Sequence, residues 1–146
     1  MSSPPHQHLD NQICLSLYSA TNALLRAYRP LLEPLDLTYP QYLVMLALWE
    51  TDAVSVTELC RRTRLDTGTV TPLLKRLESK GFLKRDRSEV DERMRVIRLT
   101  AEGRRLRERA EHVPGSLACL DALTPAQGAK IKQLAETLYR NLSALE

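Results

Sequence analysis

The feature that most constrains this chain is a change of hydrophobic period near Gly81. Before this residue, apolar side chains recur every three or four positions, as on the buried face of a helix. After it, two basic runs at 82–87 and 93–99 read as strands around a polar turn. Two short helices joined by a tight connection and followed by such a ribbon predict a winged helix-turn-helix, mainly α with a small antiparallel β-wing.

Capping residues mark the two short helices. Ser55 and Glu58 have the spacing of a capping box at the start of the first helix. Asp66 precedes the second helix, and Gly81 marks its end. The second helix has an apolar face with the spacing i, i+3, i+4 and i+7, made of Val70, Leu73, Leu74 and Leu77.

Further helices are expected on both sides of this core. A long one over 9–32 has Asp10 as its N-cap and a kink or early end at Pro30. A second one starts at Thr38, carries the capping-box partner Gln41, and is apolar on nearly every side, so it should be buried.

Two more helices should follow the wing. Thr100 caps the first, which is expected to run toward Leu117 with a kink at Pro114. Thr124 and Gln127 form the capping box of the last helix. Its apolar stripe consists of Ile131, Leu134, Leu138, Leu142 and Leu145.

The apolar stripes at the two chain ends predict a homodimer, because a chain this small cannot cover all of them internally. We expect a disordered arm over 1–8 and one domain over 9–146. Within it, 9–37 and 101–146 would form the dimerisation helices and 38–100 the winged helix-turn-helix. A two-fold dimer would read a pseudo-palindromic site on double-stranded DNA.

The positive charge is concentrated in one stretch. Residues 75–98 include nine basic and five acidic side chains, so this segment carries +4 while the whole chain carries +3. Such a concentration is typical of a phosphate-binding surface, although a solvated basic face is the common alternative. No secretory signal or membrane-spanning apolar run is apparent, which predicts a soluble cytoplasmic protein with no membrane partner.

Side chains for DNA contact can be named from this pattern. The second short helix should present Thr67, Thr69 and Thr71 near its start, and Lys75 and Arg76 further on. The wing adds four more candidates, which are Arg85, Arg87, Asp91 and Arg93. An arginine at a wing tip can enter a narrow minor groove, with a neighbouring carboxylate fixing its direction. The alternative is a surface salt bridge.

Three cysteines at wide spacings do not make a disulfide scaffold. Cys14 lies near the start of the first helix, where the helix dipole would stabilise a thiolate that a peroxide can oxidise. Cys119 is the candidate resolving thiol. An isolated cysteine on an apolar helix is more often a small core residue, and Cys60 is assigned to that class.

Several runs resemble the organic hydroperoxide resistance repressors of the MarR family. They are Cys14–Ala20, Tyr28–Arg29, Leu37–Leu46, Leu65–Leu77 and Asp91–Arg93. The resemblance extends from Leu9 to about Leu142, and the run Thr38–Tyr42 is specific to this branch.

The resemblance implies that Cys14 senses organic hydroperoxides and that the hydroxyls of Tyr28 and Tyr39 hydrogen-bond it from the other subunit. Tyr18, one helical turn from Cys14, is a further candidate for this contact. In the two-cysteine branch a C-terminal cysteine of the partner chain forms the disulfide, and Cys119 resembles it. No cofactor or metal is implied.

Two other functions deserve comparison with a thiol-based repressor. A MarR-type repressor released by a small lipophilic or phenolic ligand has the same DNA-binding core, so only chemistry separates it from a thiol sensor. A thiol peroxidase would leave the basic wing unexplained. The sequence also has no Gly-rich phosphate loop, no metal-spaced His/Cys set and no Ser/His/Asp arrangement. An enzyme is therefore not expected.

Overall fold

The computed structural model describes residues 2–88, 90–91, 93–116 and 121–146. It divides into two units, of which one comprises Met1–Ala27 with Pro114–Glu146 and the other Tyr28–Val113. The second unit holds the helix-turn-helix and the wing. No helix among the described residues is long and apolar enough to cross a bilayer.

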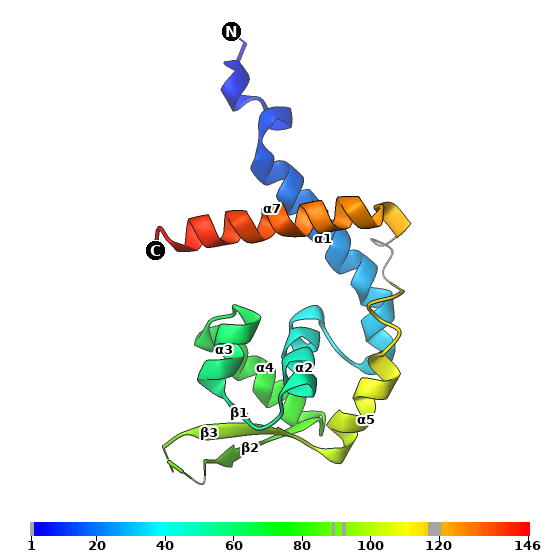
Figure 1. Cartoon of the computed structure of the whole chain (residues 1–146), viewed down its shortest axis with the longest axis vertical. Coiled ribbons are helices and arrows are strands. Elements are labelled where there is room, and N and C mark those ends of the chain that lie inside the picture. The colour runs from blue at the N-terminus through cyan, green and yellow to red at the C-terminus, as the bar shows by residue number, and fades with distance from the viewer. Residues whose placement is uncertain (1, 89, 92, 117–120) are drawn as a thin grey trace. The chain divides into compact units, whose positions relative to one another are not determined.

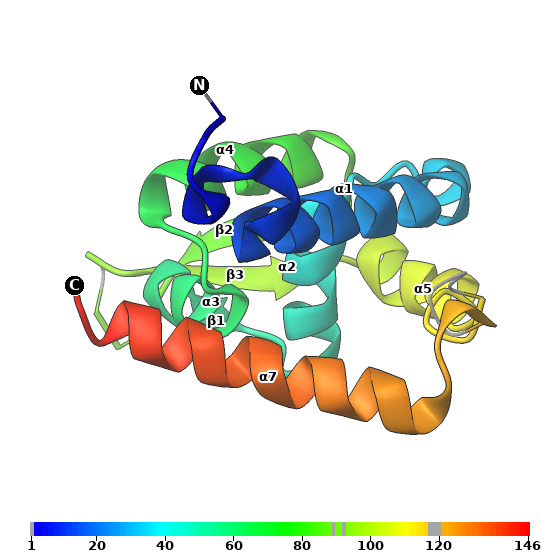
Figure 2. The same ribbon diagram turned by 90° about the horizontal axis from the view of Figure 1, so that it is seen from above.

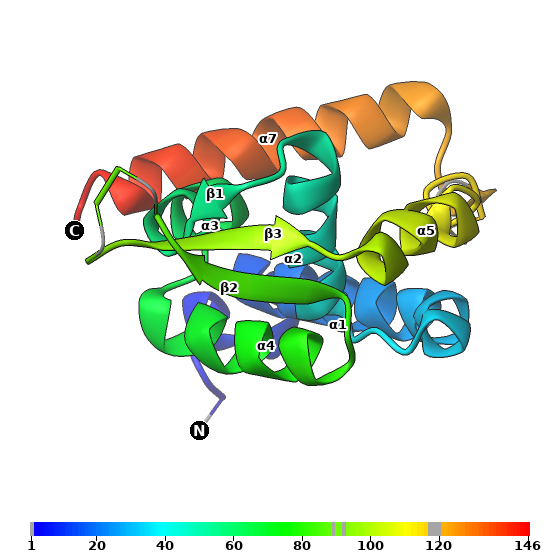
Figure 3. The same cartoon turned by 90° about the horizontal axis from the view of Figure 1, so that it is seen from below.

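Three helices lie on one side of a three-stranded antiparallel sheet in the second unit (Figure 1). The helices are α2 (Tyr39–Glu50), α3 (Val56–Thr63) and α4 (Thr67–Ser79). The strands are β1 (Val54–Ser55), β2 (Leu83–Arg87) and β3 (Arg95–Leu99). From below, β2 and β3 lie in front of α2 (Figure 3), and from above they lie behind the helices (Figure 2). The predicted fold class is confirmed.

Helix α2 is the buried centre of this unit, as its apolar sequence predicts. Val44, Met45 and Leu48 are fully buried. The predicted capping box is present, since the Gln41 N–H donates to the Thr38 hydroxyl while the Gln41 amide oxygen accepts from the Thr38 N–H. The chain therefore enters α2 in a fixed direction.

Helix α4 starts and ends where the sequence predicts. The Asp66 carboxylate accepts from the Thr69 N–H at 2.7 Å. At the other end Gly81 has φ +82°, and the N–H groups of Gly81 and Phe82 bond the carbonyls of Glu78 and Leu77. This is a Schellman motif, which a glycine in left-handed backbone favours. The predicted inward face is buried, comprising Val70, Leu73, Leu74 and Leu77.

The sheet has β3 in the middle, paired with β2 on one side and with β1 on the other. Leu83 lies opposite Leu99 and Arg85 opposite Ile97. Ile97 and Leu99 are buried, so these two residues of β3 face the core. Strand β1 is only two residues long and was not predicted, because two residues carry no periodic signal.

Helix α5 (Ala101–Ala110) continues from β3 and begins at the predicted cap, where the Thr100 hydroxyl accepts from the Gly103 N–H at 3.0 Å. Gly103 is needed for close packing, because a Cβ at this position would lie 2.0 Å from the Phe82 carbonyl oxygen. The helix ends before Pro114, and not near Leu117 as expected. Turns occupy residues 111–116.

The first unit begins with two short 3-10 helices, Pro5–Gln7 and Leu9–Asn11. The first of them lies within the arm 1–8 that was predicted to be disordered. Helix α1 (Ile13–Leu32) starts later than predicted, and Asp10 is not its cap. Asp10 lies instead within the 3-10 helix Leu9–Asn11, which the Gln12 N–H closes by donating to the Leu9 carbonyl. Pro30 does not end α1, which continues to Leu32 and belongs to the second unit from Tyr28 onward.

Helix α7 (Pro125–Ser143) begins at the predicted capping box of Thr124 and Gln127. Its apolar stripe is exposed in the single chain, with Ile131 55%, Leu134 60% and Leu142 54% accessible.

Candidate nucleic-acid interface

The exposed side of α4 carries most of the residues named for DNA contact. Thr67 and Thr69 are exposed in its first turn, and Lys75 and Arg76 are exposed further along. Thr71 is half-buried and turns partly toward the core. The N-terminal half of this surface therefore offers hydroxyl groups, and the C-terminal half offers positive charge.

Thr67 also has a contact within the protein. Its hydroxyl lies 3.8 Å from the Cys60 sulfur on α3. Cys60 is half-buried and packs against the core, in agreement with its assignment as a packing residue. The contact joins α3 to the first residue of α4.

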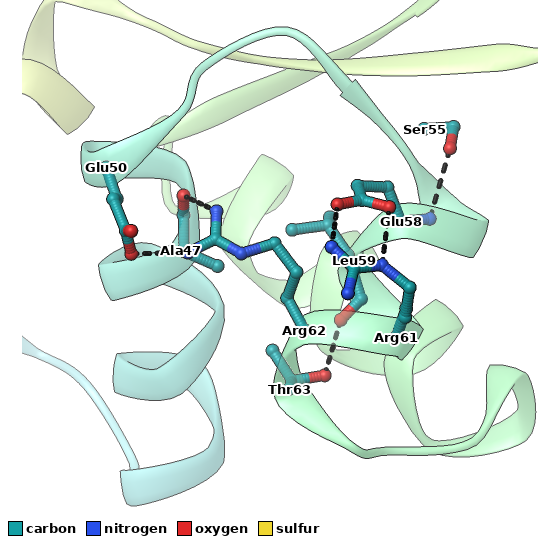
Figure 4. Close-up of polar contacts among 8 residues, drawn as sticks. All are labelled: Ala47, Glu50, Ser55, Glu58, Leu59, Arg61, Arg62 and Thr63. Atoms are coloured by element: carbon teal, nitrogen blue, oxygen red, sulfur yellow. Dashed lines mark hydrogen bonds and ion pairs between the residues drawn. The ribbon is translucent and has the colours of Figure 1, made fainter.

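Helix α3 is fastened to α2 by an arginine (Figure 4). Arg62 donates to the Ala47 carbonyl at 3.1 Å and pairs with Glu50 at the end of α2. The expected capping box of α3 is only half formed, since the Ser55 hydroxyl accepts from the Glu58 N–H while the Glu58 carboxylate binds Arg61. Both oxygens of the Glu58 carboxylate accept from the Arg61 guanidinium, at 2.9 Å from Nε and 2.5 Å from Nη2.

Arg85 of β2, named as a DNA contact, is held by helix α4. The Glu78 carboxylate accepts the Arg85 N–H at 3.1 Å and the Arg85 guanidinium at 3.2 and 3.3 Å. The hydrogen bond from Arg85 is the main reason that the pKa of Glu78 is lowered. The wing is thus joined to α4 by a charged fork, whereas Arg87 at the end of the same strand is exposed.

The wing tip exposes Asp91 and Arg93. The Asp91 carboxylate accepts the backbone N–H of Arg93 at 3.0 Å, which is an Asx turn. The contact fixes the backbone at Arg93, whereas the sequence argument placed the carboxylate on the guanidinium.

Arginines of the wing also line an open groove of about 230 Å³ beside α3. Its lining consists of Ser55, Val56, Thr57, Arg93, Met94 and Arg95. The groove therefore places two wing arginines, Arg93 and Arg95, beside the uncharged start of α3.

Two of the three tyrosines named as partners of Cys14 lie together in the second unit. The rings of Tyr28 and Tyr39 are 4.8 Å apart between centroids, and the buried Tyr42 ring lies 6.0 Å from Tyr28. Burial raises the pKa of Tyr39, so its phenol stays protonated and able to donate at neutral pH.

Cys14 is exposed and is the second residue of α1, closer to the helix start than predicted. Tyr18, 70% exposed, lies one turn further along the same helix. Both belong to the first unit, whereas Tyr28 and Tyr39 belong to the second. Cys119 lies outside the described residues.

Two residues with a role in this surface were not singled out by sequence reasoning. Glu78 holds the wing, and Lys80 binds Gln41 and Asp36 at the start of α2. No spacing rule could have found either pair, because each joins different elements through the tertiary fold.

Comparison with known proteins identifies relatives over most of the chain. A family model described as transcriptional regulator SarA/Rot matches residues 26–109. The organic hydroperoxide resistance transcriptional regulator of Bacillus subtilis is 42% identical over 140 residues, which cover 96% of this chain and 93% of that protein. These relatives are transcriptional regulators and not enzymes.

Solved structures show the same fold. Reduced AbfR of Staphylococcus epidermidis bound to DNA is 32% identical with a TM-score of 0.79, over 92% of this chain and 94% of that chain. AbfR has also been solved with a disulfide formed. BpsR of Bordetella bronchiseptica, whose DNA binding is regulated by 6-hydroxynicotinic acid, is 26% identical with a TM-score of 0.81, over 94% of this chain and 98% of that chain.

Proposed function

Because this chain belongs to the MarR/SarA-type family of winged-helix transcription regulators, and is a DNA-binding regulator similar to the organic hydroperoxide resistance type, we propose that it is a redox-controlled repressor. As a homodimer it holds operator DNA while Cys14 is reduced. An organic hydroperoxide oxidises Cys14, and the DNA is released.

The DNA-binding part of the proposal rests on one observation. Helix α4 has an exposed polar and basic face, and it holds the neighbouring wing through the Glu78–Arg85 contact. Thr67 and Thr69 can hydrogen-bond base edges or phosphates, while Lys75 and Arg76 neutralise phosphates. Arg93 at the wing tip reaches the minor groove, where negative potential attracts arginine. The Glu78–Arg85 fork keeps these two contact surfaces in one arrangement.

The proposed oxidation begins with the Cys14 thiolate, which attacks the terminal oxygen of the hydroperoxide. A sulfur–oxygen bond forms and the peroxide O–O bond breaks. The sulfur becomes a sulfenic acid, and the departing alkoxide takes a proton from water to give an alcohol. Cys119 of the partner subunit then attacks the Cys14 sulfur, forming a disulfide and expelling water.

Two features of Cys14 support this chemistry. It is exposed in the first turn of the 20-residue helix α1, so a hydroperoxide can reach its sulfur. The rings of Tyr28 and Tyr39 lie next to each other, and burial raises the pKa of Tyr39, so that its phenol can donate to a thiolate. In the proposed dimer this pair comes from the other subunit.

The exposed apolar stripe of α7 supports a second copy of the chain as the partner. A dimer with two-fold symmetry places two α4 helices in successive major grooves and reads a pseudo-palindrome. Selection from randomised duplex DNA with the reduced protein should therefore enrich an inverted repeat. Enrichment of a single half-site would contradict the dimeric mode of binding.

The disulfide step has its own test. After treatment with cumene hydroperoxide, the wild type should run as a cross-linked dimer on a non-reducing gel, and Cys119→Ser should not. Cys60→Ser is the matched control and should cross-link like the wild type. Cross-linking that survives Cys119→Ser but not Cys60→Ser would assign the resolving role to Cys60.

Control by a small ligand is the second candidate, because the DNA binding of the similar BpsR responds to 6-hydroxynicotinic acid. A variant with all three cysteines changed to serine separates the two mechanisms. If 6-hydroxynicotinate or salicylate releases DNA from this variant, the ligand mechanism operates without any thiol. If neither does while hydroperoxide releases the wild type, the thiol mechanism stands.

A further inference from the structure

Lys80 ends α4 and fastens that helix to the start of α2. Its ammonium group donates to the Asp36 carbonyl at 2.5 Å and to the Gln41 amide oxygen at 3.0 Å, and it lies 3.4 Å from the Asp36 carboxylate. Only 24% of the Lys80 side chain is exposed. All its acceptors belong to residues 36–41, which we call the α2 entry segment because they lead into α2 and include its first residues.

The capping box of the α2 entry segment and Lys80 share one acceptor. Gln41 is 2% exposed, and its amide oxygen accepts both from Lys80 and from the Thr38 N–H of the capping box. Asp36 has φ +56°, a left-handed conformation, and its N–H donates to the Glu33 carbonyl. Any displacement of the capping box therefore also displaces the oxygen to which Lys80 is bound.

The α2 entry segment also contributes Tyr39 to the tyrosine pair. Tyr39 is the first residue of α2, and its ring lies 4.8 Å from that of Tyr28 on α1. Tyr39 directly follows the capping threonine, Thr38, so the tyrosine pair and the capping box are adjacent.

At its other end the Lys80 contact leads to both DNA-facing elements. Lys80 is the C-cap of α4, and Glu78, two residues earlier, holds Arg85 of the wing. The end of α4 therefore contacts both the α2 entry segment and the wing.

We propose that Lys80 is a positioning residue that couples the α2 entry segment to α4, so that DNA binding and the stability of the capping box influence each other. Coupling between two sites is reciprocal, so DNA on α4 must stabilise the capping box by the same factor as the capping box favours DNA. The inference requires DNA binding by α4, but it does not depend on thiol oxidation as the trigger.

Amide hydrogen exchange of the full-length reduced protein tests this reciprocity. In the wild type, adding the selected duplex should slow exchange at the capping-box amides of Thr38 and Gln41 by about fivefold or more. In Lys80→Met the DNA-dependent slowing should fall below about twofold, and Lys80→Arg should restore it. Lys130→Met on the exposed face of α7 is the matched control and should behave as the wild type.

The proposal is overturned if Lys80→Met keeps the wild-type slowing, or if the wild type shows none while bound to DNA. Lys80→Gln, which also removes the charge, gives the same comparison should Lys80→Met fail to fold. A wild type that ignores hydroperoxide but keeps the Lys80-dependent slowing would refute the thiol trigger and support the coupling.

Discussion

The Glu78 carboxylate at the end of α4 accepts three hydrogen bonds from Arg85, one from the backbone N–H and two from the guanidinium. This contact sets the angle between α4 and the wing, since Arg85 is the central residue of β2. In the proposed complex, DNA contacts α4 and the wing at the same time. Their relative position is therefore part of the binding surface.

Removing the charge of Glu78 should loosen the wing. We expect Glu78→Gln to weaken binding of the selected duplex by about three- to tenfold, because the hydrogen bonds of Arg85 to a carboxylate are replaced by weaker ones to an uncharged amide oxygen. Fluorescence anisotropy of labelled DNA measures the change. Glu108→Gln on the exposed surface of α5 is the control, and equal affinities for the two variants would show that the fork does not position the wing.

The same fork predicts a pH dependence of stability. The Arg85 hydrogen bond lowers the pKa of Glu78 from its ordinary value of 4.5. A lowered pKa means that the contribution to folding is present above the ordinary value and is lost as the pH falls through the folded-state value. The melting temperatures of wild type and Glu78→Gln should differ at neutral pH and converge in acid. A difference that is constant from pH 7 to pH 3 would contradict this assignment.

Arg93 at the wing tip should contribute about one phosphate contact to DNA binding. Arg93→Ala should weaken DNA binding and flatten the slope of log affinity against log salt by about one. Arg107→Ala, an exposed arginine on α5, should leave the slope unchanged. An Arg93→Ala variant with the wild-type slope would mean that this guanidinium does not meet DNA.

The close approach of α5 to the wing makes Gly103 a test of packing. Alanine would place its Cβ 2.0 Å from the Phe82 carbonyl oxygen, a backbone atom that cannot move aside cheaply. We expect Gly103→Ala to lower the free energy of unfolding by about 1–3 kcal/mol. A denaturant titration of both variants measures this. At Gly128 on α7 a Cβ would meet nothing within 4 Å, so Gly128→Ala should leave the free energy of unfolding unchanged or raise it.

Local chemistry was readable from the sequence. The caps at Thr38, Asp66, Thr100 and Thr124 are confirmed, because a capping oxygen and its N–H partner lie within three residues of each other. The buried face of α4 followed from spacing alone. The start of α1 was missed because the 3-10 turn Leu9–Asn11 and the helix itself present the same short-range pattern.

Contacts between elements were not readable. Lys80 and Gln41 are 39 residues apart, and the groups that meet there are brought together only by the packing of α4 against α2. Arg85 was expected on DNA because a basic residue in a wing strand has no visible partner in the sequence. The fold supplies that partner, Glu78, from the preceding helix.

The central claim is that the oxidation state of one sulfur controls DNA binding, and anisotropy of the selected duplex with stepwise cumene hydroperoxide tests it most directly. The reduced wild type should bind and then release the DNA as about one equivalent of thiol is consumed per subunit. Cys14→Ser should bind with similar affinity and keep the DNA at every dose. Release of DNA from Cys14→Ser at the wild-type dose would contradict the account.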